Sequence, residues 1–236
     1  AEHFPSVKMV RAEDSKGFCA ARARNLCAAA ARGKFLLFVD ADIVLERDLG
    51  TWIATSARPK TFYRAHPDGG FNAWGTALCA RADFIRIGGY DEAFRRWGGE
   101  DIDLYARLVA AGAVQATLPR DCVTAIEHGD EERQLKGASR NQLTHSYLIY
   151  HQAKEDVAKL VGQLPDLPTR SSLLELIIEK VVRFAKGGGQ KPVHIELIVN
   201  QGVKGGRHIN LKRSLVYTLE RVEQAVEQTP SSAEVN

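Results

Sequence analysis

An uninterrupted apolar run from Phe35 to Val39 is the hydrophobic pattern around which the chain is organised. Five apolar residues without a polar break are typical of a strand buried on both faces of a parallel sheet. The run ends at Asp40 and Asp42, which are separated by the small Ala41. In an extended backbone these carboxylates point the same way, at the edge where open α/β sheets bind their ligands. The pattern therefore predicts a site for a hard divalent cation; the alternative is a solvated turn.

Hydrophobic periodicity elsewhere predicts alternating helices and strands. Helical patterns cover residues 17–32, 81–87, 100–109, 145–160, 173–184 and 211–226, with a short helix around 52–53. Strand patterns cover residues 7–10, 71–79, 113–118, 122–126 and 193–199. Residues 57–70 contain two prolines and two glycines and are expected to form a loop or an edge strand. Gly75 interrupts the run 71–79, which indicates a close approach of backbone to ligand.

This order of elements predicts an α/β fold, with a mixed sheet flanked by helices and a helical C-terminal extension. We expect a core over residues 1–135 and a helical extension over 136–186. A glycine linker at 187–189 then leads to a strand–turn–helix module with a disordered tail, over 190–236.

Composition narrows the class of protein. A chain of 236 residues, 44% hydrophobic and 26% charged, is ordinary for a soluble globular protein with one large or two small domains. Its formal charge of +3 is too small to indicate a nucleic-acid-binding protein, although a basic cleft would suit an anionic ligand. The four cysteines lack metal-binding spacing and are expected to be free thiols. Neither a leader nor an apolar run long enough to span a membrane is seen, so a cytoplasmic protein is expected.

Charged residues gather at the starts of two predicted helices. Glu100, Asp101 and Asp103 lie in the first turn of one helix, where the helix dipole stabilises acids, so simple capping would explain them. The stretch Trp97-Gly-Gly99 precedes them, however, and an aromatic residue followed by a glycine pair indicates a hinged wall beside a binding site. In the other helix, the cations Arg22 and Arg24 oppose the dipole, so they are either surface residues or are held for an anion.

Four segments together resemble nucleotide-sugar glycosyltransferases of the GT-A fold. They are Gly17-Phe-Cys-Ala-Ala-Arg-Ala-Arg-Asn25, Phe38-Val-Asp-Ala-Asp42, Trp97-Gly-Gly-Glu-Asp101 and His128. The likeness is to the family 2-like branch that contains β-1,4-galactosyltransferases, polypeptide N-acetylgalactosaminyltransferases and bacterial chondroitin-type polymerases, and it covers roughly residues 7–130. The resemblance implies a Rossmann-like mixed sheet that lacks the first strand–helix units at its amino end.

Position by position, the resemblance implies a Mn²⁺ or Mg²⁺ site formed by Asp40, Asp42 and His128. The residues implied in binding the nucleotide-sugar donor, with UDP as the expected nucleotide, are Arg22, Arg24, Asn25, Asp40, Gly75 and Trp97. Those implied at the glycan or other hydroxyl acceptor are Gly98, Gly99, Glu100 and Asp103. Asp101 is implied as the general base, with Glu100 as the second catalytic acid. Such a metal stabilises the charge that develops on a diphosphate leaving group, while the base takes the proton of the attacking hydroxyl.

The residues alone leave other functions open. A histidine after a strand, such as His128, is often a surface residue rather than a ligand. The chain could instead be a non-catalytic glycan-binding or scaffold protein with a degenerate transferase fold. A third alternative is a metal-dependent hydrolase that uses Asp40, Asp42 and His128. The donor sugar, the acceptor, the stereochemical outcome and a homo-oligomeric state are not determined by the sequence.

Overall fold

The helices and strands follow most of the predicted pattern. The computed structural model describes residues 7–12, 17–45, 48–67, 71–126, 137–199 and 213–221. Its α-helices are α1 (Ala20–Ala30), α2 (Leu49–Ser56), α3 (Arg81–Arg86), α4 (Glu100–Ala110), α5 (Arg140–Val161) and α6 (Leu167–Lys186). Its strands are β1 (Phe35–Phe38), β2 (Ile43–Leu45), β3 (Thr61–Arg64), β4 (Ala77–Ala80), β5 (Val114–Thr117), β6 (Val123–Ala125), β7 (Val193–Val199) and β8 (Arg213–Leu219). Short 3₁₀ turns occupy η2 (Phe71–Gly75) and η3 (Arg120–Cys122).

A four-stranded mixed sheet lies at the centre of the first half of the chain. Its strand order is β1-β4-β3-β5, in which β3 and β5 are parallel and the other pairs are antiparallel. The predicted mixed α/β architecture with flanking helices is therefore confirmed. A separate antiparallel pair, β2 with β6, places the segment that follows Asp42 beside residues 123–125. The backbone N–H of Ile126 donates to the carbonyl of Asp42 over 2.7 Å, which ties the Asp-x-Asp turn to the end of β6.

The prediction that β1 is a strand of a parallel sheet is wrong. Among the described strands β1 pairs with β4 alone, in antiparallel orientation, and forms one edge of the sheet. Its residues are nevertheless apolar throughout because both faces are covered, with Leu36 and Phe38 packed in one core cluster and Leu37 against another. The strand stops at Phe38, and the backbone N–H of Ile43 closes a turn on the carbonyl of Asp40 over 3.2 Å. Asp40 and Asp42 therefore lie in a tight turn instead of an extended backbone.

Three other local predictions also need correction. The segment around β3 is neither loop nor edge, since β3 lies between β4 and β5 in the sheet. The run 71–79 begins as a 3₁₀ turn and becomes a strand at Ala77, two residues after Gly75. Residues 7–10 form neither helix nor strand.

The predicted helix over residues 211–226 is wrong for β8, which is an antiparallel partner of β7. In β8 the half-buried residues Leu215, Tyr217 and Leu219 recur at every second position, so they face the core from a strand but would spread around a helix. Tyr217 and Leu219 pack against the core formed by α5, α6 and β7.

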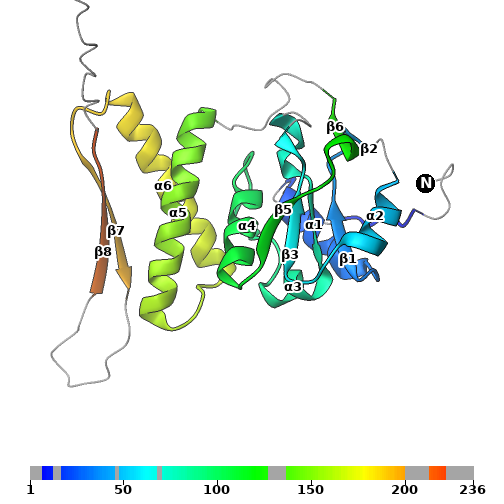
Figure 1. Cartoon of the computed structure of the whole chain (residues 1–236). Coiled ribbons are helices and arrows are strands. Elements are labelled where there is room, and N and C mark those ends of the chain that lie inside the picture. Colours follow the sequence, from blue (N-terminus) through cyan, green and yellow to red (C-terminus); the bar gives the residue numbers. More distant parts are fainter. Residues whose placement is uncertain are drawn as a thin grey trace, which may run out of the picture.

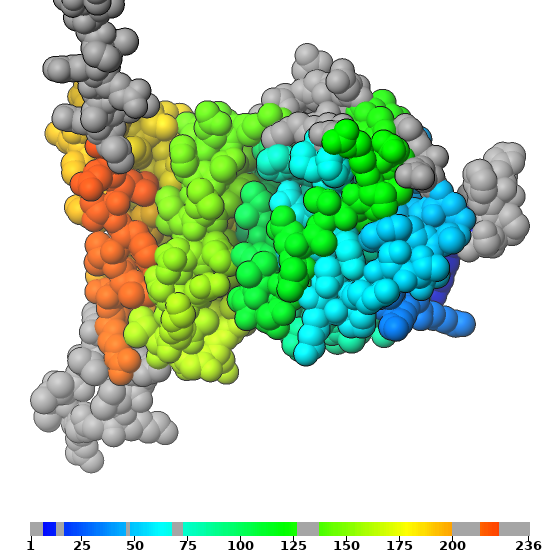
Figure 2. Space-filling view, in the orientation of Figure 1, coloured from blue at the N-terminus to red at the C-terminus, as the bar shows by residue number. Residues whose placement is uncertain are grey.

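The helical extension is joined to the sheet through α4. Figure 1 shows the β7–β8 hairpin at one end of the molecule, with α5 and α6 beside it and α4 between these helices and the sheet. In the space-filling view of Figure 2 the C-terminal elements cover one end and the earlier strands and helices cover the other.

Local capping residues determine where α5 begins and ends. A capping box of Ser139 and Gln142 starts the helix, and Gly162, with a left-handed φ of 82°, ends it.

Two global properties complete the fold. All four cysteines are free, as expected; Cys27 is exposed and the other three are buried. Among the described residues, none of the helices is long and apolar enough to cross a membrane.

Candidate active site

Arg24 of α1 is the centre of a cluster of three acids that come from two other segments of the chain. Its guanidinium donates to Asp40 Oδ1 over 2.6 Å, to Glu100 Oε1 over 3.0 Å and to Asp101 Oδ1 over 3.1 Å. Asp40 lies just after β1, whereas Glu100 and Asp101 begin α4. The structure thus brings together four of the residues that the sequence analysis selected.

The cluster carries more negative than positive charge. Within the described part of the chain, three carboxylates meet one guanidinium. The side chain of Asp40 is 45% exposed, whereas that of Glu100 is only 10% exposed, and Glu100 Oε2 is buried without a hydrogen-bond partner in this part of the chain. An additional cation or proton would therefore be stabilised here.

Burial and like charge perturb the acids of the cluster. Burial raises the pKa of Glu100, and the nearby Arg24 only partly opposes this. The pKa of Asp101 is raised further, first by burial and then by the charge of Glu100. Burial works against the charged form of Arg24, but Asp101 and the other neighbours overcome it, so the pKa of Arg24 is raised. A carboxylate with a raised pKa beside a fixed cation is the setting in which general bases are found.

Gly75 lies directly against the same carboxylates. A Cβ atom at this position would lie 3.0 Å from Asp40 Oδ2 and 3.2 Å from Asp101 Oδ2. The second oxygens of both acids therefore face one stretch of bare backbone, which a side chain at position 75 would crowd. Close approach of the Gly75 backbone to charged side chains is thus observed, while its contact with a donor stays a prediction.

Aromatic and cationic side chains that the sequence analysis missed surround this cluster. Arg24 lies over the ring of Tyr90, with 5.2 Å between the guanidinium carbon and the ring centroid. The hydroxyl of Tyr105 donates to the carbonyl of Trp74 over 3.0 Å, and Arg64 lies over the rings of both Tyr105 and Trp74. Helical spacing could have indicated Tyr105, which lies four residues after Asp101 and hence on the same face of α4.

The glycine pair before α4 is packed against α5. Gly98 and Gly99 have φ angles of 79° and 91°, which favour glycine. A Cβ on Gly99 would lie 2.5 Å from Tyr147 Cδ2, and the Tyr147 hydroxyl donates to the carbonyl of Trp97 over 2.8 Å. In addition, Arg140 lies over the Trp97 ring at 4.8 Å. The predicted wall beside the acids is therefore fastened to the helical extension.

Two residues of α1 differ in their surroundings from Arg24. The side-chain amide of Asn25 donates to the carbonyl of Tyr90 and to Glu92, and its oxygen accepts from the backbone N–H of Tyr90 over 2.8 Å. Asn25 therefore holds the loop that carries Tyr90. Arg22 is half-buried and precedes Arg24 by two residues, so it projects about 200° away around the helix. Donor contacts of both residues stay predictions.

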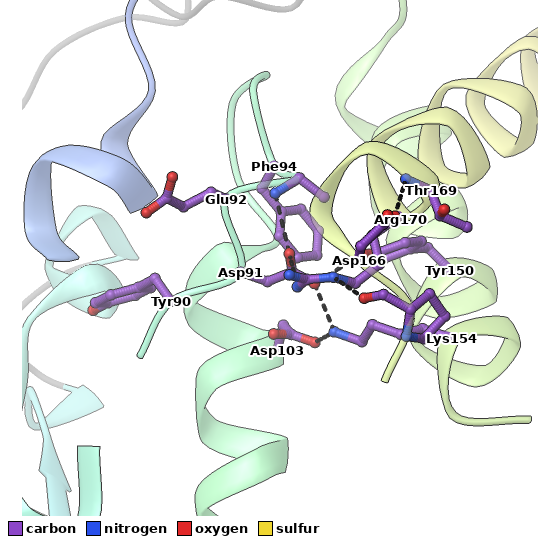
Figure 3. A network of polar contacts seen from close by, with 12 residues as sticks. Tyr90, Asp91, Glu92, Phe94, Asp103, Tyr150, Lys154, Asp166, Thr169 and Arg170 are labelled. Atoms are coloured by element: carbon purple, nitrogen blue, oxygen red, sulfur yellow. Dashed lines mark hydrogen bonds and ion pairs between the residues drawn. The ribbon is translucent and has the colours of Figure 1, made fainter. Parts of the chain in front are cut away.

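Asp103 lies apart from the Arg24 cluster, in a buried ion network (Figure 3). It pairs with Arg107 over 2.8 Å, with His151 over 3.3 Å and with Lys154. Burial alone would raise the pKa of Asp103, but these partners hold it well below its ordinary value. With a side chain only 1% exposed, Asp103 faces the extension, and its expected contact with an acceptor stays a prediction.

Asp91 is the second acid of the ion network. It accepts from Lys154 over 2.9 Å, from Arg170 over 2.5 Å and from the hydroxyl of Tyr150 over 2.8 Å. Burial opposes its charged form, yet Lys154 and Arg170 keep its pKa below the ordinary value. The network therefore joins the loop before α4, α4 itself, α5 and α6, and its central charges on Asp91, Asp103 and Lys154 are almost fully removed from water.

The structure describes two of the three predicted metal ligands, Asp40 and Asp42. Asp42 is half-buried in the turn after β1, and His128 lies outside the described residues. Within the ranges that the structure describes, no three His, Cys, Asp or Glu side chains are grouped as metal ligands. Asp42, however, shares a backbone hydrogen bond with Ile126, which precedes His128 by two residues in sequence.

Comparison with known families agrees with the geometry of this region. Residues 56–129, less than half of the chain, match the family described as the N-terminal domain of galactosyltransferase. The resemblance to glycosyltransferases is confirmed. The matched segment includes Gly75 and both acids at the start of α4, whereas Arg24 and Asp40 precede it.

Individual relatives are similar over limited lengths. A validoxylamine A glucosyltransferase of Streptomyces hygroscopicus subsp. jinggangensis is 55% identical over 40 residues, which are 17% of this chain and 9% of the relative. A Drosophila β-1,4-galactosyltransferase 7 variant, crystallised with manganese, UDP-galactose and xylobiose, has a TM-score of 0.43 at 16% identity and covers 56% of this chain and 61% of that one. A mannosyltransferase of Pyrobaculum calidifontis in complex with GDP-mannose and Mn²⁺ has a TM-score of 0.42 at 15% identity, covering 80% and 61% respectively. The chain thus spans less than two thirds of each relative.

Proposed function

We propose that this chain is a divalent-metal-dependent glycosyltransferase, which transfers a sugar from a nucleotide sugar to a hydroxyl group of a glycan or another acceptor. The observation that carries the proposal is the convergence of Asp40, Glu100 and Asp101 on Arg24, beside the bare backbone of Gly75. The match of residues 56–129 to a galactosyltransferase family supports the same activity. UDP is the nucleotide that the resemblance in the sequence implies.

The proposed metal ligands suit a hard cation. In our proposal Asp40 and Asp42, together with His128, hold Mn²⁺ or Mg²⁺, since carboxylates with one imidazole form a harder set than a zinc site. Support comes from the surplus of negative charge around Arg24 and from the backbone hydrogen bond that joins Asp42 to the end of β6. The bound ion would stabilise the negative charge on the departing diphosphate.

The remaining residues act on the substrates. Asp101 takes the proton of the acceptor hydroxyl, and Glu100 holds the acceptor or the loop before α4. Both acids accept from the same nitrogen of Arg24, Nη1, so helix direction does not separate their roles and the exposure of each side chain does. Asp101 suits the role of base because its side chain is 20% exposed, twice the exposed fraction of Glu100, and its Oδ2 faces Gly75 together with Asp40. Arg24 keeps both acids in place and balances part of their charge.

A screen of nucleotide sugars tests the proposal directly. Thermal unfolding is followed with UDP-, GDP- and ADP-sugars, each with and without Mn²⁺, because a ligand that binds only the folded protein raises its melting temperature. We expect a UDP-sugar to stabilise the protein in the presence of Mn²⁺ and not in the presence of EDTA. The absence of any metal-dependent stabilisation would contradict the proposal.

A second candidate is a glycan-binding protein without transferase activity. It is favoured by the ion pairs that Arg24 already forms with Asp40 and Asp101, which could serve structure alone. Titration with UDP and Mn²⁺ separates the two functions, because metal-dependent binding of UDP supports the transferase. Binding of a glycan without metal or nucleotide supports this second candidate. Release of free sugar without any acceptor requirement would indicate a hydrolase instead.

Replacement of Asp42 by alanine should abolish Mn²⁺-dependent binding of UDP. The fold should survive because Asp42 contributes its backbone carbonyl to the bond with Ile126, and alanine keeps that carbonyl. Isothermal titration measures UDP affinity with and without Mn²⁺, and circular dichroism checks the fold. As a control, Glu179→Ala removes an exposed carboxylate from α6 and should bind normally. Normal binding by Asp42→Ala would remove the metal site from the proposal.

Replacement of His128 by alanine should weaken Mn²⁺ binding by roughly 10-fold or more, since losing a metal ligand costs at least as much as losing a residue that supports one. The affinity is measured by Mn²⁺ titration with electron paramagnetic resonance, which counts the free ion. His145→Ala, a change within α5, provides the matched histidine control. An unchanged Mn²⁺ affinity would mean that His128 is a surface histidine.

A further inference from the structure

Trp74 is an exposed aromatic side chain directly beside the acid cluster. Its exposed fraction is 49%, and it precedes Gly75, whose backbone faces the second oxygens of Asp40 and Asp101. We propose that Trp74 is the platform on which the acceptor sugar stacks, with the C–H face of a pyranose ring against the indole. This inference rests on the proposed transferase function and names a substrate class for the acceptor side of the same site.

The position of Trp74 is fixed relative to the base. Its carbonyl accepts from the Tyr105 hydroxyl over 3.0 Å, and Tyr105 lies on α4 one turn after Asp101. Tyr105 is itself immobilised, being 6% exposed and stacked on Phe62 with 5.5 Å between ring centroids. One hydrogen bond therefore links the backbone of Trp74 to the helix that carries Asp101.

The indole ring is also held by a cation. The guanidinium carbon of Arg64 lies 5.3 Å from the centroid of the Trp74 ring and 4.5 Å from that of Tyr105. Contact with a guanidinium favours one orientation of an aromatic ring. About half of the Trp74 surface nevertheless remains accessible to water, beside the acids of the cluster, so a ligand at these acids can contact the indole.

The acceptor fits this surface better than the donor does. A pyranose has one apolar C–H face and a rim of hydroxyls, so it can rest on an aromatic ring while one hydroxyl reaches a carboxylate. The hydroxyl that reacts must lie within hydrogen-bond reach of the base. Since Trp74 is tied to the helix that carries Asp101, a sugar stacked on Trp74 presents its rim to that acid.

Saturation-transfer NMR with simple glycosides tests the platform. The probes are methyl β-D-glucopyranoside, methyl β-D-galactopyranoside and methyl β-D-xylopyranoside, added to the full chain with UDP and Mn²⁺. We expect at least one probe to receive saturation at its ring C–H protons from the unmodified protein. Trp74→Ala should raise the dissociation constant about 10-fold or more, whereas Trp74→Phe should keep most of the affinity. The alanine variant retains the carbonyl that Tyr105 binds.

Controls separate this inference from the proposed function. Ile85→Ala removes another exposed apolar side chain, from α3, and should bind the probe normally. The affinity of Trp74→Ala for UDP–Mn²⁺ should equal that of the unmodified protein. Three results would overturn the platform. Trp74→Ala binds the glycoside as well as the unmodified protein does, none of the three probes binds, or Trp74→Ala loses UDP binding while it keeps glycoside binding. If UDP and Mn²⁺ do not bind while the glycoside still depends on Trp74, the transferase function fails and the sugar platform stands.

Discussion

Replacing Asp101 by asparagine should lower kcat by ~10²-fold or more, which is the range of general-base catalysis. Asparagine keeps the size of the side chain and an oxygen that can accept from Arg24, which now donates to Asp101 Oδ1 over 3.1 Å. It removes only the ability to take a proton. The affinities for the UDP-sugar and for Mn²⁺ should barely change because this acid acts on the acceptor.

Steady-state kinetics and titration calorimetry check this result together, since one reports turnover and the other donor binding. Glu100→Gln is the matched comparison: it should disturb binding of the acceptor or the order of the loop more than the proton transfer. Near-normal turnover of Asp101→Asn would count against the assignment and move the role of base to Glu100. Loss of donor binding in that variant would place Asp101 on the donor side instead.

Replacing Lys154 by methionine should lower the free energy of unfolding by ~3–5 kcal/mol, the usual cost of breaking a buried ion pair by removing one partner. Lys154 is 2% exposed and pairs with both Asp91 and Asp103, each 1% exposed. Without the ammonium group, two carboxylates would remain close together in a medium that solvates charge poorly. Urea-induced unfolding, followed by circular dichroism, measures the loss.

An exposed lysine of the same helix provides the control. Lys159→Met should change the stability by no more than ~0.5 kcal/mol, as is usual for surface substitutions. Adding Asp103→Asn to Lys154→Met should restore part of the loss, because the repulsion between the buried carboxylates of Asp91 and Asp103 is then removed. The double-mutant cycle gives the coupling between Lys154 and Asp103. A loss no larger than that of the control would show that water reaches the network in solution.

The sequence predicted those helices and strands whose pattern of apolar residues depends on neighbouring residues alone. Helix α4 follows from the apolar spacing after Glu100. Helix α5 was expected only over residues 145–160, because the capping box of Ser139 and Gln142 that starts it was overlooked. The direction and the position of β1 could not be predicted, because an apolar run is equally compatible with a central parallel strand and with an edge strand covered by helices. Strand β8 was mistaken for a helix because its alternation, over seven residues, competes with a similarly weak helical pattern.

The candidate site was predicted as a set of residues but not as a geometry. The joining of Asp40 to Glu100 and Asp101 depends on Arg24, whose guanidinium spans contacts between residues far apart in sequence. Asp103 was grouped with the other acids by proximity in sequence, yet two further helical positions turn it to another face of α4, toward Lys154. Trp74 was missed because only tertiary packing distinguishes an exposed tryptophan beside a site from an ordinary apolar residue, whereas the spacing of Tyr105 from Asp101 on α4 was a signal left unused.

The division of α4 between two environments has a consequence for how the protein folds. Leu104 and Leu108 belong to the apolar core beneath the sheet, whereas Asp103 completes its charge pairing only when α5 is in place. The loop that precedes α4 is likewise shared, since Asp91 requires cations from α5 and α6. We therefore expect the helical extension and the sheet to unfold together, in one cooperative transition.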